Sequence, residues 1–436
     1  MSLVTDSPVN SSSSDDFAAL LDAELDSSSS EPSPDQEVED DFDHEIERIK
    51  RRKLELDSSD EPQGSTPMNL EASIEKDICS HPGVFRGLCI RCGQKMDDGS
   101  GVAFGYIHKD LRLGNDEIVR LRTTDLKNLL RRRKLYLVLD LDHTLLNSTR
   151  LVEMTPEERH LSSQENPLQG GFFKLDSMHM MTKLRPFVHT FLKEASNMFE
   201  MSIYTMAERP YALEMAKLLD PEGLYFSSRV ISQADSTQRH QKGLDVVLGQ
   251  ESAVLILDDT EHVWQKHKDN LLLMDRYHFF ASSCRQFGSN FRSLSEMNSD
   301  ESETDGALAT VLKVLKRVHS MFYDSESEDN LDCKDVRQVL KIVRAEILKG
   351  CKLVFSRVFP TKFQADNHHL WKIAEQLGAT CLTELDPSVT HVISADAGTE
   401  KSRWAVREKK FLVNKRWIEA ANYLWRRQPE ENFPVS

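Results

Sequence analysis

The sequence predicts an α/β protein: a parallel-sheet domain, a smaller α/β domain after it, and a disordered acidic tail before both. Three short apolar runs, at 135–139, 201–205 and 253–259, alternate with helical patterns, which is typical of a buried parallel β-sheet covered by helices. A second alternation of this kind begins at residue 350. The 436 residues are enough for two domains, each with its own core.

The net charge of −16 comes from the N-terminal tail. Residues 1–78 hold 22 acidic and 6 basic residues, so the rest of the chain carries equal numbers of both. Because this segment is acidic and serine-rich, it can bury too little apolar surface to offset its chain entropy. We therefore expect residues 1–74 to be disordered. The basic cluster at 50–53 fits a nuclear-import patch and solvated charge equally well.

The composition argues against a membrane-spanning protein and against a secreted, disulfide-bonded one. No apolar run approaches the about 18 residues that a spanning helix needs, and the first residues lack the pattern of a secretory signal. Seven cysteines, three of them within 79–92, do not resemble a disulfide framework. We therefore expect a reducing compartment, the cytosol or the nucleus.

Residues 75–130 are predicted to form a lead-in that contains four closely spaced metal-ligand types. Cys79 and His81 are separated by one residue and Cys89 and Cys92 by two, and such a set can hold a tetrahedral structural Zn²⁺. The spacing differs from that of common zinc fingers, so a small turn that carries thiols is the competing interpretation.

The parallel-sheet domain is predicted over 131–290, an acidic linker with helices over 291–340, and the smaller domain over 341–436. Apolar residues at helical spacing predict the helices of the first two segments. Those helices are expected at 186–199, 209–219, 242–248, 307–321 and about 335–348.

Acidic residues follow the first strand directly, in the segment DLDHT. Asp140 and Asp142 stand two positions apart at the carboxyl end of a strand, so both carboxylates can face one pocket. Beside a phosphoryl group they need a cation, and Mg²⁺ with oxygen ligands is suited to that. One carboxylate can then attack phosphorus while the other protonates the leaving oxygen. A turn with capping aspartates is the structural alternative.

Further residues at strand ends favour phosphate chemistry over a plain turn. Thr205 ends the second strand, where its hydroxyl can bind a phosphate oxygen, and Lys242 follows a polar stretch and can offset phosphate charge. Asp258 and Asp259 end the third strand and can complete a cation site. Each has an ordinary structural role open to it, but their order and their position at strand ends argue against coincidence.

The segments DLDHT, IYTMA, the lysine and LDDTEHVW resemble the four signature motifs of the haloacid-dehalogenase superfamily. They are most similar to its FCP/SCP branch, the phosphatases of the RNA polymerase II C-terminal domain, as are TKLRPF and LDPEGLYF. The segment at 105–114 looks closest to the plant members. The resemblance implies a haloacid-dehalogenase-like fold, with Asp140 as nucleophile and Asp142 as general acid and base.

The resemblance also implies which residues bind phosphate and metal. Thr205 and Lys242 would bind the phosphate. Mg²⁺, for which Mn²⁺ or Co²⁺ can substitute, would be held by Asp140, Asp259 and the backbone at Asp142, with Asp258 in support. Arg185, expected in the catalytic set, and Asp220 match further positions on which members depend, although structural salt-bridging competes for both.

The smaller domain resembles a BRCT domain. Gly378 and Ala379 follow an amphipathic helix pattern, and Trp417 lies in a late helix where it would fill the core. BRCT domains dock protein partners and sometimes bind phosphopeptides, for which Ser356 and Lys401 would form the pocket. We favour plain docking, because a single BRCT domain often lacks such a pocket.

Together these resemblances imply a nuclear, Mg²⁺-dependent protein-serine/threonine phosphatase that acts on the heptad-repeat domain of RNA polymerase II and so regulates transcription. General transcription factors could reach the BRCT domain or the tail, and neither nucleic acid nor membrane is expected as a direct partner. The alternative is a BRCT-based phosphoprotein adaptor with a vestigial site. A small-molecule phosphatase fits less well, because the insert at 147–172 is short and polar and predicts an open site.

Overall fold

The computed structural model describes residues 79–97, 99–163, 171–288, 291–324, 334–360 and 364–435. The tail predicted to be disordered at 1–74 and the basic cluster at 50–53 lie outside these residues. Among the described residues, no helix combines the length and the apolar character that crossing a bilayer requires.

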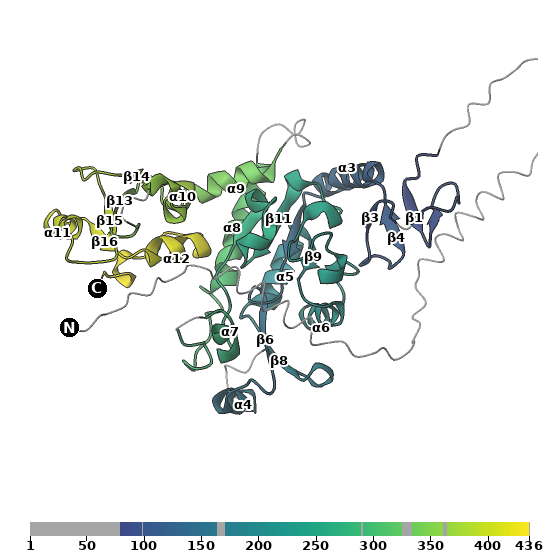
Figure 1. Ribbon diagram of the computed structural model, residues 1–436, viewed down its shortest axis with the longest axis horizontal. Helices are drawn as coiled ribbons and strands as arrows, with labels where there is room; N and C mark the ends of the chain where they lie inside the picture. Colours follow the sequence, from purple (N-terminus) through teal and green to yellow (C-terminus); the bar gives the residue numbers. More distant parts are fainter. Residues whose placement is uncertain are drawn as a thin grey trace, which may run out of the picture. The chain divides into compact units, whose positions relative to one another are not determined.

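A five-stranded parallel sheet forms the centre of the first domain (Figure 1). Its order is β10-β9-β5-β11-β12, and the three predicted strands are the middle three. Apolar runs suit this position because central strands are buried on both faces. The strands are β5 Leu135–Leu139, β9 Phe199–Tyr204, β10 Val230–Ile231, β11 Val254–Asp258 and β12 Leu271–Leu273.

Four helices share one apolar core with this sheet, and they confirm all but one of the predicted helices. Pro210 stands in the first turn of the second one, where a missing backbone N–H costs no intrahelical bond. The helix expected in the acidic linker buries Leu308, Val311 and Leu315 in the same core as residues of β5 and β9. The helices are α5 Val188–Ser196, α6 Arg209–Leu219, α8 Ala307–Tyr323 and α9 Val336–Arg344.

The helix predicted at 242–248 is wrong. Only a single 3-10 turn, Leu244–Val246, forms there, and Gly243 before it is extended. The apolar residues of this segment are buried together, so it has no polar face of the kind that an amphipathic helix turns to solvent. Its carbonyl groups at Leu244 and Val247 accept hydrogen bonds from Arg122 instead of bonding along a helix.

The insert after the first strand forms a small sheet of its own (bottom of Figure 1). Its strands are antiparallel in the order β6-β8-β7. The elements are β6 Leu146–Arg150, α4 Pro156–Ser163, β7 Phe172–Leu175 and β8 Met180–Leu184, with α7 Ala281–Gln286 beside β6. The predicted openness of the site stays a prediction, because residues 164–170 are outside the described chain.

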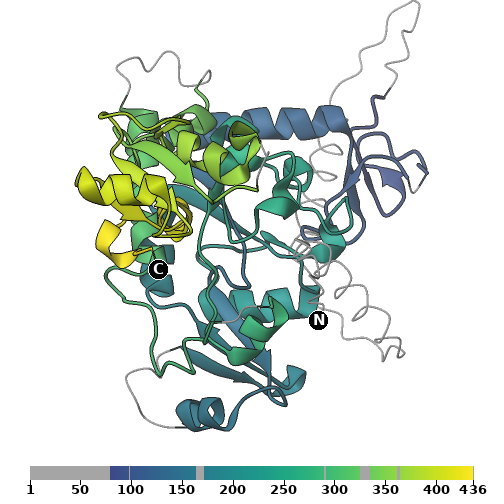
Figure 2. The same ribbon diagram turned by 60° about the vertical axis from the view of Figure 1, so that its left-hand side comes forward.

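The lead-in before the first domain is more regular than the sequence predicts. A four-stranded antiparallel sheet in the order β2-β1-β4-β3 is followed by a helix of 17 residues, the long blue helix of Figure 2. Charged residues cover most of that helix, and only Ile118, Leu129 and Leu130 are buried. The elements are β1 Gly83–Phe85, β2 Leu88–Cys89, β3 Val102–Ala103, β4 Leu111–Leu113 and α3 Asn115–Arg131.

The C-terminal domain is a second parallel sheet, in the order β14-β13-β15-β16, with its own core. Trp417 is fully buried in that core, as predicted. Gly378 has a φ of +91°, and a Cβ atom there would lie 1.8 Å from the carbonyl oxygen of Ala345, so only glycine fits. The elements are β13 Lys352–Ser356, α10 His369–Gln376, β14 Thr380–Leu382, β15 His391–Ser394, α11 Glu400–Arg407, β16 Phe411–Val413 and α12 Arg416–Leu424.

The position of α8 in the core predicts that this helix stabilises the first domain. Leu315 is fully buried, so Leu315→Ala should lower the free energy of unfolding by about 2–5 kcal/mol through lost burial and a cavity. Denaturant unfolding of the full chain measures this. Ile342→Ala, which alters a residue on α9 that is 51% exposed, is the control and should change stability little. Equal effects of the two substitutions would contradict the role given to α8.

Candidate active site

Three carboxylates and one ammonium group meet at the carboxyl edge of the central sheet. Asp140 follows β5, Asp258 ends β11, and one oxygen of each lies within 4.8 Å of the others and of one oxygen of Asp259. The Nζ of Lys242 is 2.6 Å from Asp140 Oδ1 and 2.7 Å from Asp258 Oδ2. All four side chains are buried, the most exposed at 8%. The fold therefore assembles these four predicted residues.

The charges of this cluster are only partly balanced. Burial would lower the pKa of Lys242, but Asp140 and Asp258 raise it above its ordinary value, so the ammonium stays charged. Burial raises the pKa of Asp140 and of Asp258, against the opposing effect of Lys242. Asp140 and Asp258 share this one lysine and lie beside Asp259, and like charges in a buried site raise one another's pKa. The site therefore favours an additional cation.

Asp259 differs from the other two acids because it has a cation of its own. The Nε of Arg276 lies 2.6 Å from Asp259 Oδ2, and Thr260 Oγ1 donates to the same oxygen at 2.9 Å. Burial raises the pKa of Asp259, but Arg276 outweighs this effect and lowers it below the ordinary value. This carboxylate is therefore ionised at neutral pH and ready to act as an oxygen ligand.

Asp258 is fixed by donors that the sequence did not identify. The indole Nε1 of Trp264 donates to its Oδ2 at 2.8 Å, and the backbone N–H of Thr260 donates to its Oδ1 at 2.8 Å. Trp264 belongs to the segment LDDTEHVW, whose resemblance pointed to the aspartates alone. The donors hold Asp258 in the orientation that places one oxygen on Lys242.

Asp142 faces a different set of partners. Its Oδ1 accepts a hydrogen bond of 2.6 Å from the hydroxyl of Tyr211, and that hydroxyl is 2.7 Å from the hydroxyl of Ser148, which is 2.8 Å from that of Thr182. Burial raises the pKa of Asp142, with Tyr211 opposing. The carboxylates that group together are those of Asp140, Asp258 and Asp259, and the metal contact expected from the backbone at Asp142 stays a prediction.

The turn that carries Asp142 is held by Arg185. His143 has a φ of +63°, and the fully buried Arg185 donates to the carbonyl oxygens of His143 at 3.3 Å and Thr144 at 3.0 Å. The same guanidinium pairs with both oxygens of Glu301, at 2.6 and 3.0 Å. These contacts favour a positioning role for Arg185 over direct participation in chemistry.

Thr205 lies where it was predicted, directly after β9 at the edge that carries the carboxylates. It is buried, and its Oγ1 accepts a hydrogen bond of 3.0 Å from the backbone N–H of Ala207. The hydroxyl hydrogen can still be donated to a phosphate oxygen.

Asp220 organises a loop. Its carboxylate accepts three backbone N–H bonds, from Leu224 at 2.8 Å, Tyr225 at 2.7 Å and Phe226 at 3.0 Å. These contacts make Asp220 a cap at the end of α6, which favours a structural role for this residue over a catalytic one.

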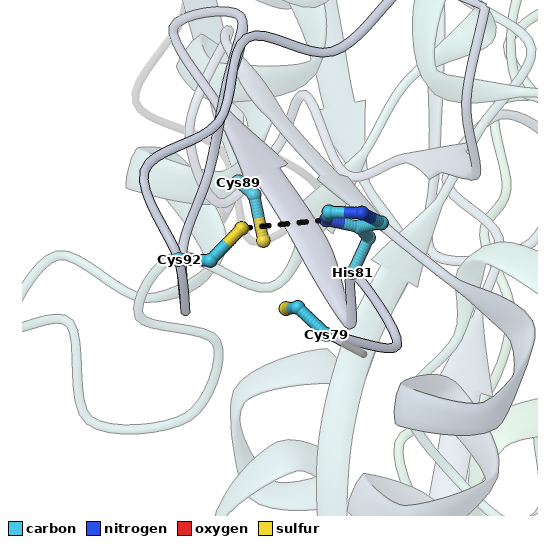
Figure 3. Close-up of side chains that lie close together, drawn as sticks. All are labelled: Cys79, His81, Cys89 and Cys92. Carbon is cyan, nitrogen blue, oxygen red and sulfur yellow. Dashed lines mark hydrogen bonds between the residues drawn. The ribbon is translucent and has the colours of Figure 1, made fainter. Parts of the chain in front are cut away.

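Cys79, His81, Cys89 and Cys92 also come together (Figure 3). One ligand atom of each lies within 4.8 Å of the others, and Cys92 Sγ is 3.5 Å from His81 Nδ1. Burial raises the pKa of the Cys89 thiol, but hydrogen bonds from the backbone at Cys92 and Arg91 and from His81 lower it to about 6. Such a thiol is largely thiolate at neutral pH, the form that binds metals.

Comparisons with known proteins agree with both domains. The family model of NLI interacting factor-like phosphatases matches residues 135–305, and that of the BRCA1 C-terminal (BRCT) domain matches residues 343–421. RNA polymerase II C-terminal domain phosphatase-like 4 of Arabidopsis thaliana is 60% identical over 441 residues, which cover 99% of this chain and 97% of that protein. Phosphatase-like 3 of the same plant is 41% identical over 318 residues, 70% of this chain and 25% of that protein.

A solved structure shows the same fold. A variant of the fission yeast RNA polymerase II CTD phosphatase, bound to beryllium fluoride, matches with a TM-score of 0.59 at 27% sequence identity. The match covers 73% of this chain and 100% of that one.

The contacts of Asp220 predict that its loss destabilises the fold without disabling the site. Asp220→Ala should lower the free energy of unfolding by more than about 2 kcal/mol, because three backbone donors lose a charged acceptor. Denaturant unfolding, together with turnover per folded molecule of a small aryl phosphate, tests this. Glu222→Ala, on an exposed residue of the same loop, is the control. Normal stability with lost turnover would instead place Asp220 in the chemistry.

Proposed function

The chain belongs to the RNA polymerase II C-terminal domain phosphatases, and we propose that it hydrolyses phosphoserine and phosphothreonine esters in the heptad repeats of that polymerase domain. It is a protein phosphatase. The observation that carries the proposed chemistry is the buried contact of Lys242 with Asp140 and Asp258, beside a second acid, Asp142, that belongs to a separate hydrogen-bond chain.

Asp140 is the nucleophile of the proposed mechanism. One of its carboxylate oxygens attacks phosphorus, the bond from phosphorus to the serine or threonine oxygen breaks, and an aspartyl-phosphate forms. Lys242 offsets the negative charge that this approach brings together, since its ammonium lies 2.6 Å from the nucleophile. The Thr205 hydroxyl, after the neighbouring strand, donates to a phosphate oxygen.

Asp142 is the general acid and then the general base. Its raised pKa keeps a proton available, and that proton passes to the leaving oxygen as the ester breaks. The resulting carboxylate takes a proton from the water that attacks the aspartyl-phosphate, which releases inorganic phosphate and restores Asp140. Tyr211 holds Asp142 in the orientation for both steps.

A divalent cation fits the residues present. Three carboxylates within 4.8 Å of one another offer hard oxygen ligands, and Lys242 together with Arg276 balances only part of their charge. Asp140, Asp258 and Asp259 would hold Mg²⁺, which when bound would neutralise charge between the nucleophile and the phosphate. Mn²⁺ and Co²⁺ accept the same ligand type and would substitute.

The C-terminal domain serves docking in this proposal. The hydroxyl of Ser356 is buried and donates to Thr399, and Lys401 Nζ lies 2.9 Å from the carbonyl oxygen of Thr383. These polar groups are engaged within the domain, which favours protein docking over phosphate reading. The substrate places the protein in the nucleus, with the polymerase as its main partner and general transcription factors as further ones.

Asp140→Asn tests the proposed function. The substitution keeps the size of the side chain but removes the nucleophile, so turnover of heptad peptides that carry a single phosphoserine should fall by more than about a thousandfold. Phosphate release by the full chain in Mg²⁺ measures this. Asp176→Asn, whose side chain is 78% exposed, should turn over normally.

Three results would count against parts of the proposal. Undiminished turnover in Asp140→Asn would end the mechanism. Equal rates on unrelated phosphopeptides would end the substrate assignment while leaving the chemistry intact. A wild-type chain that lacks all Mg²⁺-dependent turnover but binds phosphoproteins would favour the adaptor.

Tyr211→Phe separates the role of Asp142 from that of Asp140. The phenyl ring fills the same space but cannot donate to Asp142, so kcat should fall by about 10- to 100-fold while KM changes little. Steady-state kinetics on the same peptide measures both constants. Tyr225→Phe, in the loop after α6, is the control. A purely structural role would lower stability and leave kcat per folded molecule unchanged.

A further inference from the structure

We propose that Cys79, His81, Cys89 and Cys92 bind a structural Zn²⁺, and that this ion fastens the lead-in on which the position of the Lys242 loop depends. The loop is residues 242–248. The inference goes beyond the phosphatase reaction, because neither this ion nor the lead-in takes part in the chemistry proposed above.

The ligand atoms are spaced as a tetrahedral zinc site requires. Zn–S bonds of about 2.3 Å and Zn–N bonds of about 2.0 Å at tetrahedral angles put ligand atoms about 3.5–3.8 Å apart. Cys92 Sγ and His81 Nδ1 are 3.5 Å apart, and all four ligand atoms fall within 4.8 Å of one another. Figure 3 shows the side chains of His81, Cys89 and Cys92 directed toward one another, with Cys79 beside them. Cys79 is two residues before His81, so the local chain brings it to the cluster.

The backbone is shaped around Cys89 and Cys92. Cys89 ends the β1–β2 hairpin, and the chain then folds back so that the N–H of Gly93 donates to the carbonyl oxygen of Cys89 at 2.9 Å. Gly93 has a φ of +71°, a left-handed conformation that favours glycine. The N–H of Arg91 points at Cys89 Sγ from 3.4 Å, and an amide directed at sulfur stabilises a thiolate. A turn that merely carries thiols does not require these arrangements.

The lead-in sheet is too small to hold itself together without help. Its strands are two or three residues long, and the buried apolar side chains on them are those of Val84, Cys89 and Leu113. Units with so little core are usually held by a metal or by disulfides. Three thiolates and an imidazole are the ligand set that Zn²⁺ takes in closed structural sites.

The ligand segment is tied to the residues that follow it. The N–H of Gly114, the N-cap of α3, donates to the carbonyl oxygen of Pro82 at 2.8 Å, next to the ligand His81. A Cβ atom on Gly83 would lie 3.0 Å from the carbonyl oxygen of Arg112 in β4, so these chains are closely packed. Fixing the ligands therefore fixes the start of α3 and the strand before it.

Those elements in turn hold the Lys242 loop. The hydroxyl of Tyr106 donates to the carbonyl oxygen of Val246 at 3.0 Å, and Arg122 of α3 donates to that of Val247 at 2.9 Å. Phe104, Tyr106, Leu113 and Ile118 of the lead-in share one apolar core with Leu244, Val246 and Val247 of the loop. Because the loop is not helical, it depends on contacts from outside: the N–H groups of Lys242 and Leu244 bond Val263 and His267, and the lead-in holds the residues that follow.

The test uses the full-length chain and measures metal content. The wild-type chain, purified and dialysed, should hold about one Zn²⁺, and Co²⁺ put in its place should give the visible absorption of tetrahedral cobalt with thiolate ligands. Cys92→Ala should lower zinc affinity by at least about tenfold, and Cys92→His, which restores a ligand, should retain most of the metal. Cys381→Ala, on a half-buried cysteine of the C-terminal domain, should keep it all. A wild-type chain without stoichiometric zinc, or equal zinc in Cys92→Ala and Cys381→Ala, would overturn the site.

One further variant and one more measurement sharpen the test. Asp259→Asn should leave zinc content unchanged, whereas loss of zinc in this variant would move the ion to the carboxylate cluster and overturn the proposal. Cys92 is exposed, so without a metal its replacement by alanine should not alter stability. Amide hydrogen exchange of peptides covering 242–248 should be faster in Cys92→Ala than in the wild-type chain, with exchange at 352–356 unchanged. Unchanged exchange at 242–248 despite lost zinc would overturn the link to the loop.

Discussion

The arrangement of the active site depends on the position of one ammonium group, that of Lys242. Lys242 bonds Asp140 after the central strand and Asp258 at the end of its neighbour, and it is buried with both. Removing one partner of such a buried set leaves uncompensated charge and costs about 3–5 kcal/mol. The lysine is carried by an irregular segment, so its place depends on contacts from outside that segment. Val263 and His267 bond the backbone of Lys242 and Leu244, and Tyr106 and Arg122 add contacts from a lead-in that begins more than a hundred residues earlier.

Around this centre each acid has partners that suit a different task. Arg276 keeps Asp259 ionised, Trp264 and Thr260 orient Asp258, and Tyr211 orients Asp142, whose pKa is raised by burial. Two carboxylates of the segment DLDHT thus differ in environment although only one residue separates them. After these acids the left-handed backbone at His143 turns the chain into the next strand.

The sequence predicted the strands and their terminal residues well, for a physical reason. Short apolar runs such as 135–139 are typical of the central strands of a parallel sheet. The residues that end such strands lie at the same edge of the sheet. Asp140, Thr205 and Asp258 are therefore found by pattern alone. Trp417 was predicted as a core residue from the resemblance to BRCT domains, and it is fully buried.

The partners of these residues were not predictable, because they are set by tertiary packing. Tyr211 lies in a helix whose pattern shows only that it is amphipathic, and Arg276 lies in a stretch without regular structure. Segment 242–248 was predicted as a helix because its apolar spacing fits one, yet the side chain of Arg122 bonds its carbonyl groups. Ile118, Leu129 and Leu130 are buried along α3, but its region was interpreted only as a charged lead-in, and its packing against the loop is set by tertiary structure.

The hydroxyl chain from Asp142 through Tyr211 to Ser148 and Thr182 has a consequence for how such an enzyme can be adjusted. Ser148 and Thr182 belong to β6 and β8 of the inserted sheet, outside the parallel sheet that carries the acids. Small polar changes in that insert can therefore alter the strength of the acid while the nucleophile and the cation ligands stay as they are. The pKa of Asp142 can therefore differ between related enzymes that catalyse the same reaction.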